Sequence, residues 1–234
     1  MNLAALRAEL RLRAKPEHAA VALRFFKTGP GQYGEGDEFL GLKVPQIRAL
    51  VRSCDGLVEA DVLALLHSAL HEERLLALFC LVRRFERGDQ KTRASIFSVY
   101  LKNTRWINNW DLVDTSAPHI VGAWLLDKDR SVLRRLAKSR SLWERRIAVL
   151  ATQTFIRGGQ FDDTVEIVRS LLGDTHDLMH KACGWMLREV GNRDVKTLEG
   201  FLAAHVAQMP RTMLRYAIEK LPEKRRKAWL AARS

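Results

Sequence analysis

The stretch "HEERLLALFCLVRRFERG", residues 71–88, decides the fold class. It places Leu75, Leu78, Val82 and Phe85 on one face at helical spacing, and Gly88 ends the pattern. The segments "LAALRAELRLRA", "LWERRIAVLATQTFIRGG" and "DLMHKACGWMLREVGNRD" show the same period. Stretches that alternate with a period of two residues are essentially absent. The sequence therefore predicts an all-α protein.

Small residues recur at similar places in these segments, each close to a basic residue. They are Ala77, Ala148, Ala182 and Ala217. The last three are about 35 residues apart, and the first gap is about twice as long, which is the spacing of a repeat with two helices. Such repeats form solenoids in which small residues let neighbouring helices pack closely. We predict a helical solenoid in a single domain, residues 1–234; the alternative is chance recurrence of alanine.

The charge balance favours a polyanionic partner. Lys and Arg number 39 against 27 Asp and Glu, a formal net charge of +12, which places nucleic acid ahead of an anionic membrane surface. No run approaches the roughly 18 apolar residues of a membrane span, and the charged N-terminus has no signal-peptide apolar region. We expect a soluble, cytoplasmic monomer that does not bind membranes.

The basic residues cluster on the second helix of each predicted repeat, which would line the concave groove of a solenoid. Each one alone is an ordinary surface charge, but their recurrence predicts a basic track. They are Arg83, Arg84, Arg145, Arg146, Lys181, Arg188 and Arg215.

The three cysteines, Cys54, Cys80 and Cys183, are far apart in apolar surroundings. They lack metal-ligand spacing, and an odd number is a poor disulfide framework. We expect buried, reduced thiols, and no metal or cofactor.

One segment interrupts the helical pattern. Residues 27–45, "KTGPGQYGEGDEFLGLKVP", hold five glycines and two prolines, which predicts a loop over residues 28–44 and a helix with Pro45 near its start. We expect the loop to pack near Phe25 along a rim of the groove; the alternative is a self-packed connector. Under both interpretations, a Gly-Ser replacement of "GPGQYGEGDEF" should leave thermal stability nearly intact.

The stretch "RWINNWDLVDTSAPHIVGAW", residues 105–124, is unusual in its tryptophans and carboxylates. Asn108 or Asn109 is a plausible helix N-cap, and Asp111 in the first turn is explained by the helix dipole. Asp114 lies four residues after Trp110 and so on the same helical face, too late to be a cap.

Pro118 breaks the local helix near Asp114, unless Ser116 caps a new helix. A groove that only binds phosphates gains nothing from a carboxylate, so Asp114 among basic residues favours catalysis. The alternative is a buried aspartate paired with an arginine. Trp143 and Trp185 lie on later repeats, and each alone is typical of a core residue.

The motifs "NNWDLVD", "LWERRIAVL" and "KACGWMLRE", in this order, resemble those of the AlkD-type DNA alkylation repair family. The resemblance implies a right-handed superhelical solenoid of HEAT-like repeats. It also implies a DNA glycosylase that excises positively charged N3- and N7-alkylated purines from duplex DNA without base flipping. The competing functions are a non-catalytic nucleic-acid-binding module and a protein-interaction scaffold.

The resemblance also assigns roles to residues. Asp114 corresponds to the catalytic carboxylate, Trp110 and Trp185 to the active-site aromatics, and Arg146 to the active-site arginine. Phe25 stands where the family has a tyrosine, and Asp177 and Leu178 stand where paired aromatics are expected. The residues expected to contact DNA are Arg146, Arg188, Phe25, Lys27, Arg145 and Lys181.

Overall fold

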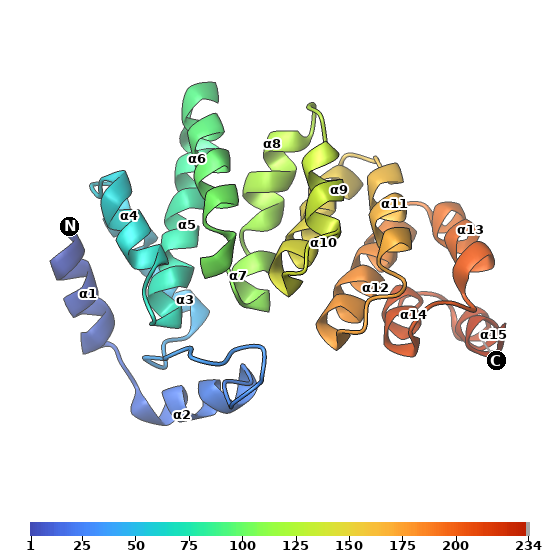
Figure 1. Cartoon of the computed structure of the whole chain (residues 1–234), viewed down its shortest axis with the longest axis horizontal. Coiled ribbons are helices and arrows are strands. Elements are labelled where there is room, and N and C mark those ends of the chain that lie inside the picture. The colour runs from blue at the N-terminus through green and yellow to red at the C-terminus, as the bar shows by residue number, and fades with distance from the viewer. Residues whose placement is uncertain (233–234) are drawn as a thin grey trace. The chain divides into compact units, whose positions relative to one another are not determined.

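The computed structural model describes residues 1–232, and every regular element in this range is a helix (Figure 1). The one β-type pairing within it is an isolated bridge between Glu38 and Leu70. The predicted all-α class is confirmed. The helices gather into two compact units, residues 1–116 and 117–234, and each is described by itself. The prediction of a single domain stays a prediction.

Unit 1 is built around the helix predicted over residues 71–88. This helix, α5, packs against α3, α4, α6 and α7 and ends at Arg87, directly before Gly88. The elements of unit 1 are α1 (Leu3–Leu12), α2 (Pro16–Phe25), α3 (Val44–Leu50), η1 (Val51–Cys54), α4 (Glu59–Leu66), α5 (His71–Arg87), α6 (Gln90–Lys102), η2 (Thr104–Trp106) and α7 (Trp110–Asp114).

Unit 2 is built around two long helices. The first, α10, packs against η3, α9 and α12; the second, α12, packs against α11, α13 and α14. The elements of unit 2 are η3 (Pro118–Gly122), α8 (Ala123–Leu125), α9 (Ser131–Ala137), α10 (Leu142–Arg157), α11 (Asp162–Ser170), α12 (Asp177–Gly191), α13 (Val195–His205), α14 (Arg211–Ala217) and α15 (Glu223–Ala232).

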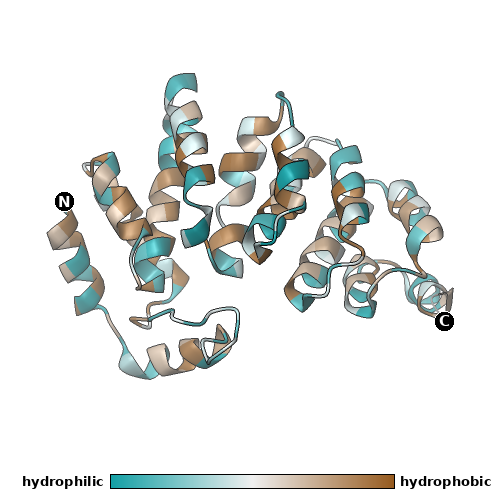
Figure 2. Cartoon of the chain, in the orientation of Figure 1, coloured by the Kyte–Doolittle hydropathy of each residue, from teal (hydrophilic) through white to brown (hydrophobic). Residues whose placement is uncertain are grey.

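The recurring small residues lie where helices approach one another. All four alanines of the predicted repeat are buried. A Cβ added at Gly184 on α12 would lie 2.4 Å from the Met213 carbonyl oxygen of α14, so only glycine fits there. Figure 2 shows hydrophobic and hydrophilic residues mixed within each helix, as expected where each helix buries one stripe and exposes another.

Ser116 does not cap a helix, so that alternative was wrong. Its hydroxyl donates to the Leu112 carbonyl oxygen at 2.5 Å and lies 2.8 Å from the Tyr100 hydroxyl. The chain then passes through a π-helical turn that begins at Pro118. Because proline has no N–H to donate, a widened turn accommodates it without a new cap.

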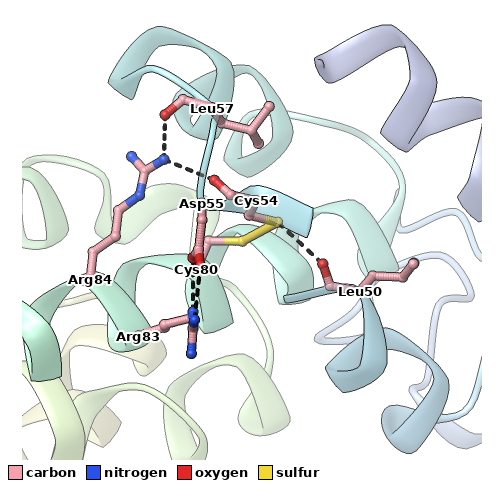
Figure 3. The surroundings of a disulfide bond; sticks show 7 residues. All are labelled: Leu50, Cys54, Asp55, Leu57, Cys80, Arg83 and Arg84. Atoms are coloured by element: carbon pink, nitrogen blue, oxygen red, sulfur yellow. Dashed lines mark hydrogen bonds and ion pairs between the residues drawn. A yellow bond between two sulfur atoms is a disulfide. The ribbon is translucent and has the colours of Figure 1, made fainter. Parts of the chain in front are cut away.

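The prediction of reduced cysteines was wrong for two of the three. Cys54 of η1 and Cys80 of α5 form a disulfide with a Cα–Cα distance of 6.2 Å (Figure 3), which is within the usual range. Their separation of 26 residues gave no signal of this pairing, because it depends on how η1 folds back along α5. Cys183 is a buried free thiol, as expected, and burial raises its pKa to about 12.

Arginines on the second half of α5 bind the segment around the disulfide. Arg83 holds both carboxylate oxygens of Asp55 at 2.8 Å, and Arg84 donates to the carbonyl oxygens of Leu57 and Cys54 (Figure 3). These two members of the predicted basic track are therefore engaged in contacts within unit 1.

Candidate functional site

The helix α7 presents Trp110 and Asp114 one turn apart. The Asn109 side chain accepts from the Trp110 N–H at 2.9 Å, which confirms Asn109 as the N-cap. Trp110 and Asp114 are the first and last residues of this short helix, and both are half-buried. Burial, together with the charge of the nearby Asp114, raises the pKa of Tyr100. The Asp114 carboxylate therefore lies close enough to Tyr100 to affect its pKa, and it is still partly exposed to solvent.

Aromatic rings from α2 extend the surface around Trp110. Phe26 stacks on Trp110 with ring centroids 5.5 Å apart, and Phe25 meets the same indole edge-on at 6.0 Å. Phe25 is 61% exposed, which is unusual for a large apolar side chain. Unit 1 therefore presents an exposed aromatic surface beside the Asp114 carboxylate.

A buried network of charges holds α7 in place. The His71 ring at the start of α5 lies 2.8 Å from Asp111 on α7, through Nε2, and 3.3 Å from Asp37 of the loop, through Nδ1. Arg74 pairs with Asp37 at 2.6 Å, and the Asn109 amide donates to the same carboxylate at 3.2 Å. All five side chains are buried. The helix that carries Trp110 and Asp114 is thus bound to both α5 and the loop.

The environment of this network fixes its protonation. Burial of the His71 ring opposes its charge, but the charge of Asp111 and the hydrogen bonds to Asp111 and Asp37 outweigh burial and raise the pKa to about 9. Burial also opposes the charge of Asp37, but His71 and Arg74 together lower its pKa. At neutral pH His71 is therefore an imidazolium that donates to two carboxylates.

The neighbouring Glu72 fixes the end of the Gly-rich loop. Its carboxylate accepts from the backbone N–H groups of Gly41 at 2.8 Å, Leu40 at 3.0 Å and Leu42 at 3.2 Å. Glu73 accepts from Arg7 of α1 at 3.0 Å. The run "HEER" at the start of α5 thus connects α1, the loop and α7.

The loop packs against unit 1 and is more than a self-contained connector. Its Phe39 ring stacks on Phe26 at 5.1 Å and on His71 at 4.7 Å, and Tyr33 lies against the Phe25 backbone. The loop therefore lies beside Phe25, as expected. Asp37 is buried and Phe39 is half-buried in these contacts, so in place of the earlier expectation we predict that replacing the loop segment lowers stability.

A cavity of about 480 Å³ lies under α2 within unit 1. Apolar side chains line most of it, among them Val21, Ala22, Phe25 and Phe39, and the buried polar groups His71, Glu72 and Asp111 border it. Cavities of this size are typical of small-molecule sites.

In unit 2, Arg146 lies on α10 and is buried. Its Nη1 donates to the Leu178 carbonyl oxygen at 2.6 Å, so part of its guanidinium fixes the first turn of α12. Trp185 on α12 is half-buried, and its indole N–H donates to Glu189 at 3.2 Å. Trp143 is buried and belongs to the core.

The other predicted DNA contacts of unit 2 have carboxylate partners. Arg145 binds Asp174 at 2.6 Å and donates to two backbone carbonyls. Lys181 pairs with Asp177 at 2.7 Å, and Arg188 pairs with Glu219. In unit 1, Lys27 is exposed and lies two residues after the end of α2, with a φ of 55°.

The sequence did not identify His71, Asp37 and Arg74. One signal was present in retrospect: "HEER" places four charged or polar residues at the start of a helix whose first ten residues are all buried. Charged residues are rarely buried unless they are paired. A polar run that directly precedes an apolar stripe therefore indicates buried partners elsewhere in the chain, and Asp37 of the loop is one of them.

Among residues 1–232, no set of three or more potential ligand side chains is grouped as a metal site would require. In the same range, no helix has the length and apolarity needed to cross a bilayer.

Comparisons with known proteins agree on one family. A family model described as "DNA alkylation repair enzyme" matches residues 6–221. A solved structure described as a predicted DNA alkylation repair enzyme from Enterococcus faecalis superposes with a TM-score of 0.69 at 16% identity, covering 90% of this chain and 97% of that one. At this identity the likeness shows a shared fold. No curated protein matches the chain.

Proposed function

Since the chain belongs to the DNA alkylation repair enzyme family, we propose that it is a DNA glycosylase for positively charged N3- and N7-alkylated purines in duplex DNA. The observation that carries the proposal is the Asp114 carboxylate one turn from Trp110, beside the exposed ring of Phe25. The net charge of +12 supports a polyanionic substrate.

The reaction requires few catalytic groups from the protein. A purine alkylated at N3 or N7 already carries a positive charge, so it leaves without protonation by a general acid. Positive charge then develops on the deoxyribose, and a fixed carboxylate stabilises it electrostatically and can orient the attacking water. The indole face of Trp110 also favours a cation, by about 0.5–2 kcal/mol.

In this proposal Asp114 is the catalytic carboxylate, and Trp110 and Trp185 contact the sugar. Arg146 binds a phosphate, with Arg188, Lys181, Arg145, Phe25 and Lys27 as further DNA contacts carried over from the family motifs and the basic pattern. The half-buried position of Trp110 and Asp114 suits a nucleotide that stays in the duplex without base flipping. We further propose that the repeats form a right-handed superhelix and that the protein acts as a monomer.

The test is release of free alkylpurine from methylated duplex DNA by wild-type protein and by Asp114→Asn. The substitution keeps the shape of the side chain but removes its charge, so release should fall by about 10²-fold or more. Duplex affinity should be retained or improve, because a charge that repels phosphate is gone. Asp162→Asn, an exposed carboxylate in the first turn of α11, is the matched control and should match wild type.

Two outcomes would reject the proposal in different ways. Equal release by Asp114→Asn and wild type would remove Asp114 from the chemistry. Tight, salt-sensitive duplex binding with no release by the wild type would instead identify a non-catalytic binding module, since phosphate contacts alone give a steep salt dependence.

A further inference from the structure

The cavity under α2 has features of a ligand site that the proposed chemistry does not use. We propose that it binds a free purine base, the product that the reaction releases. The inference rests on the proposed function only for the origin of the base, since binding of a free base can be measured without any reaction.

The first observation concerns α2 itself. This helix has ten residues and none of them is buried. Val21 is 56% and Phe25 is 61% exposed, although both line the cavity. An amphipathic helix normally buries its apolar stripe against a core, but here about 480 Å³ of unfilled space lies beneath it.

The helix is nevertheless firmly attached at its two ends. At the start, the Lys15 N–H donates to the Leu40 carbonyl oxygen at 2.8 Å, and Gly41 lies so close that a Cβ there would be 2.2 Å from the Lys15 carbonyl oxygen. At the end, the Gly34 N–H donates to the Lys27 carbonyl oxygen at 3.1 Å. The loop therefore holds α2 over the cavity without filling it.

The walls of the cavity suit a flat ring. Phe26 and Phe39 line it and are stacked nearly parallel, with an interplanar angle of 15°, and Phe25 stands at its exposed edge. Because Phe26 also stacks on Trp110, and Phe39 on His71, their ring faces are occupied. A planar ligand would therefore meet the edges of these two rings, the exposed ring of Phe25 and aliphatic side chains such as Val21.

The polar groups indicate a ring with hydrogen-bonding edges. His18 lines the cavity, and its Nδ1 is buried with no hydrogen-bond partner among the described residues. A buried polar atom without a partner is costly. Asp111 also borders the cavity, and each of its oxygens accepts one hydrogen bond, from His71 or from the Leu112 N–H. A carboxylate oxygen has a second lone pair for an incoming N–H.

The same groups discriminate between ligands. A purine carries ring nitrogens and N–H groups on its edges, which are the kinds of partner that the His18 Nδ1 lacks and that the Asp111 oxygens can still accept. A hydrocarbon of the same shape would leave His18 without a partner. Two cationic side chains, His71 and Lys43, line the cavity with the two carboxylates Glu72 and Asp111, so the lining charges balance and the discrimination rests on hydrogen bonding. Phe25 borders both this cavity and the Trp110 surface. A base released beside Trp110 would therefore be next to the opening of the cavity.

The experiment is calorimetric titration of the full-length protein with adenine and 3-methyladenine, with naphthalene as the comparison probe. Both bases should bind, and naphthalene should bind at least about tenfold more weakly, as expected for the loss of one buried hydrogen bond. Binding of naphthalene as tight as adenine, or no binding of either base, would overturn the proposal.

Three variants locate the site. Ala22→Leu adds apolar volume inside the cavity and should abolish base binding. His18→Leu should weaken it about tenfold. His205→Leu is the matched control, because the Nδ1 of His205 is also buried without a partner but lies in unit 2. Unchanged affinity in both Ala22→Leu and His18→Leu would place any bound base elsewhere.

The outcome is separable from that of the proposed function. Base binding that Ala22→Leu abolishes, in a protein that releases no base from DNA, would leave the cavity assignment standing and reject the glycosylase. Base release that depends on Asp114, in a protein that binds no free base, would do the reverse.

Discussion

The proton on His71 makes the stability of the protein depend on pH in a defined window. Charged groups act on this ring from three elements: Asp37 from the loop, Asp111 from α7, and Arg74 from α5 itself. Against the opposing effect of burial, the two carboxylates raise the pKa of His71 from 6.5 to about 9. A group whose pKa is higher in the folded state stabilises the fold fully below its unfolded pKa. That contribution is lost as the pH rises through the folded pKa.

The expected magnitude follows from the two pKa values. The interval between 6.5 and about 9 corresponds to about 3 kcal/mol at 1.36 kcal/mol per pKa unit. The free energy of unfolding should therefore fall by about this amount between pH 6.5 and roughly pH 9.5. Other shifted groups titrate elsewhere: burial lowers the pKa of His176 below this window, and burial raises that of Cys183 to about 12.

The assay is urea denaturation followed by tryptophan fluorescence across this pH range. In His71→Gln the neutral amide leaves Asp37 and Asp111 without the imidazolium, so the variant should be less stable at pH 6.5 and show little further loss above it. His67→Gln is the control, because the His67 ring is exposed and lies four residues before His71 in the sequence. This variant should keep the wild-type dependence of unfolding free energy on pH. A wild-type curve that is flat over the window, or an equal slope in His71→Gln, would refute the assignment of the proton.

Further outcomes follow from the packing and the ion pairs. Asp37→Ala should lower the free energy of unfolding by about 3–5 kcal/mol, because it leaves Arg74 buried without its carboxylate; Glu38→Ala, at the exposed neighbour, should be near neutral. A Gly-Ser replacement of residues 29–39 should destabilise the protein at least as much as Asp37→Ala in calorimetry, and a wild-type melting temperature would contradict this. Arg145→Ala should lower stability by about 1–3 kcal/mol, because it leaves the buried Asp174 carboxylate without its guanidinium partner. In DNA-binding titrations, Arg145→Ala should reduce duplex affinity less than Arg146→Lys, which keeps the charge but loses the bidentate fork, and the opposite order would exchange their roles.

Helical periodicity predicted the local structure well because it depends on neighbouring residues. The helix over residues 71–88, its end before Gly88, the Asn109 cap and the start of a helix near Pro45 all appear in the structure. The close packing at Ala182 and Gly184 also follows from residue size alone.

The long-range partners could not be predicted from the same signals. Asp37 and Asp111 lie 34 and 40 residues from His71, and nothing in the spacing of charged residues specifies which carboxylate meets which ring. The disulfide has the same origin, since Cys54 and Cys80 meet only after η1 folds against α5. Such contacts depend on tertiary geometry, and one sequence without its fold does not determine them.

The net charge of +12 overstates the number of cations available to a partner. Arg83, Arg84, Arg134 and Arg145 each bind a carboxylate or a backbone carbonyl within their own unit, so these arginines stabilise helix packing. Lys27 and Lys43, at the two ends of the loop, are by contrast exposed. If DNA binds beside Trp110, the salt dependence of affinity should therefore respond more to these two lysines than to the arginines that recur along the repeats.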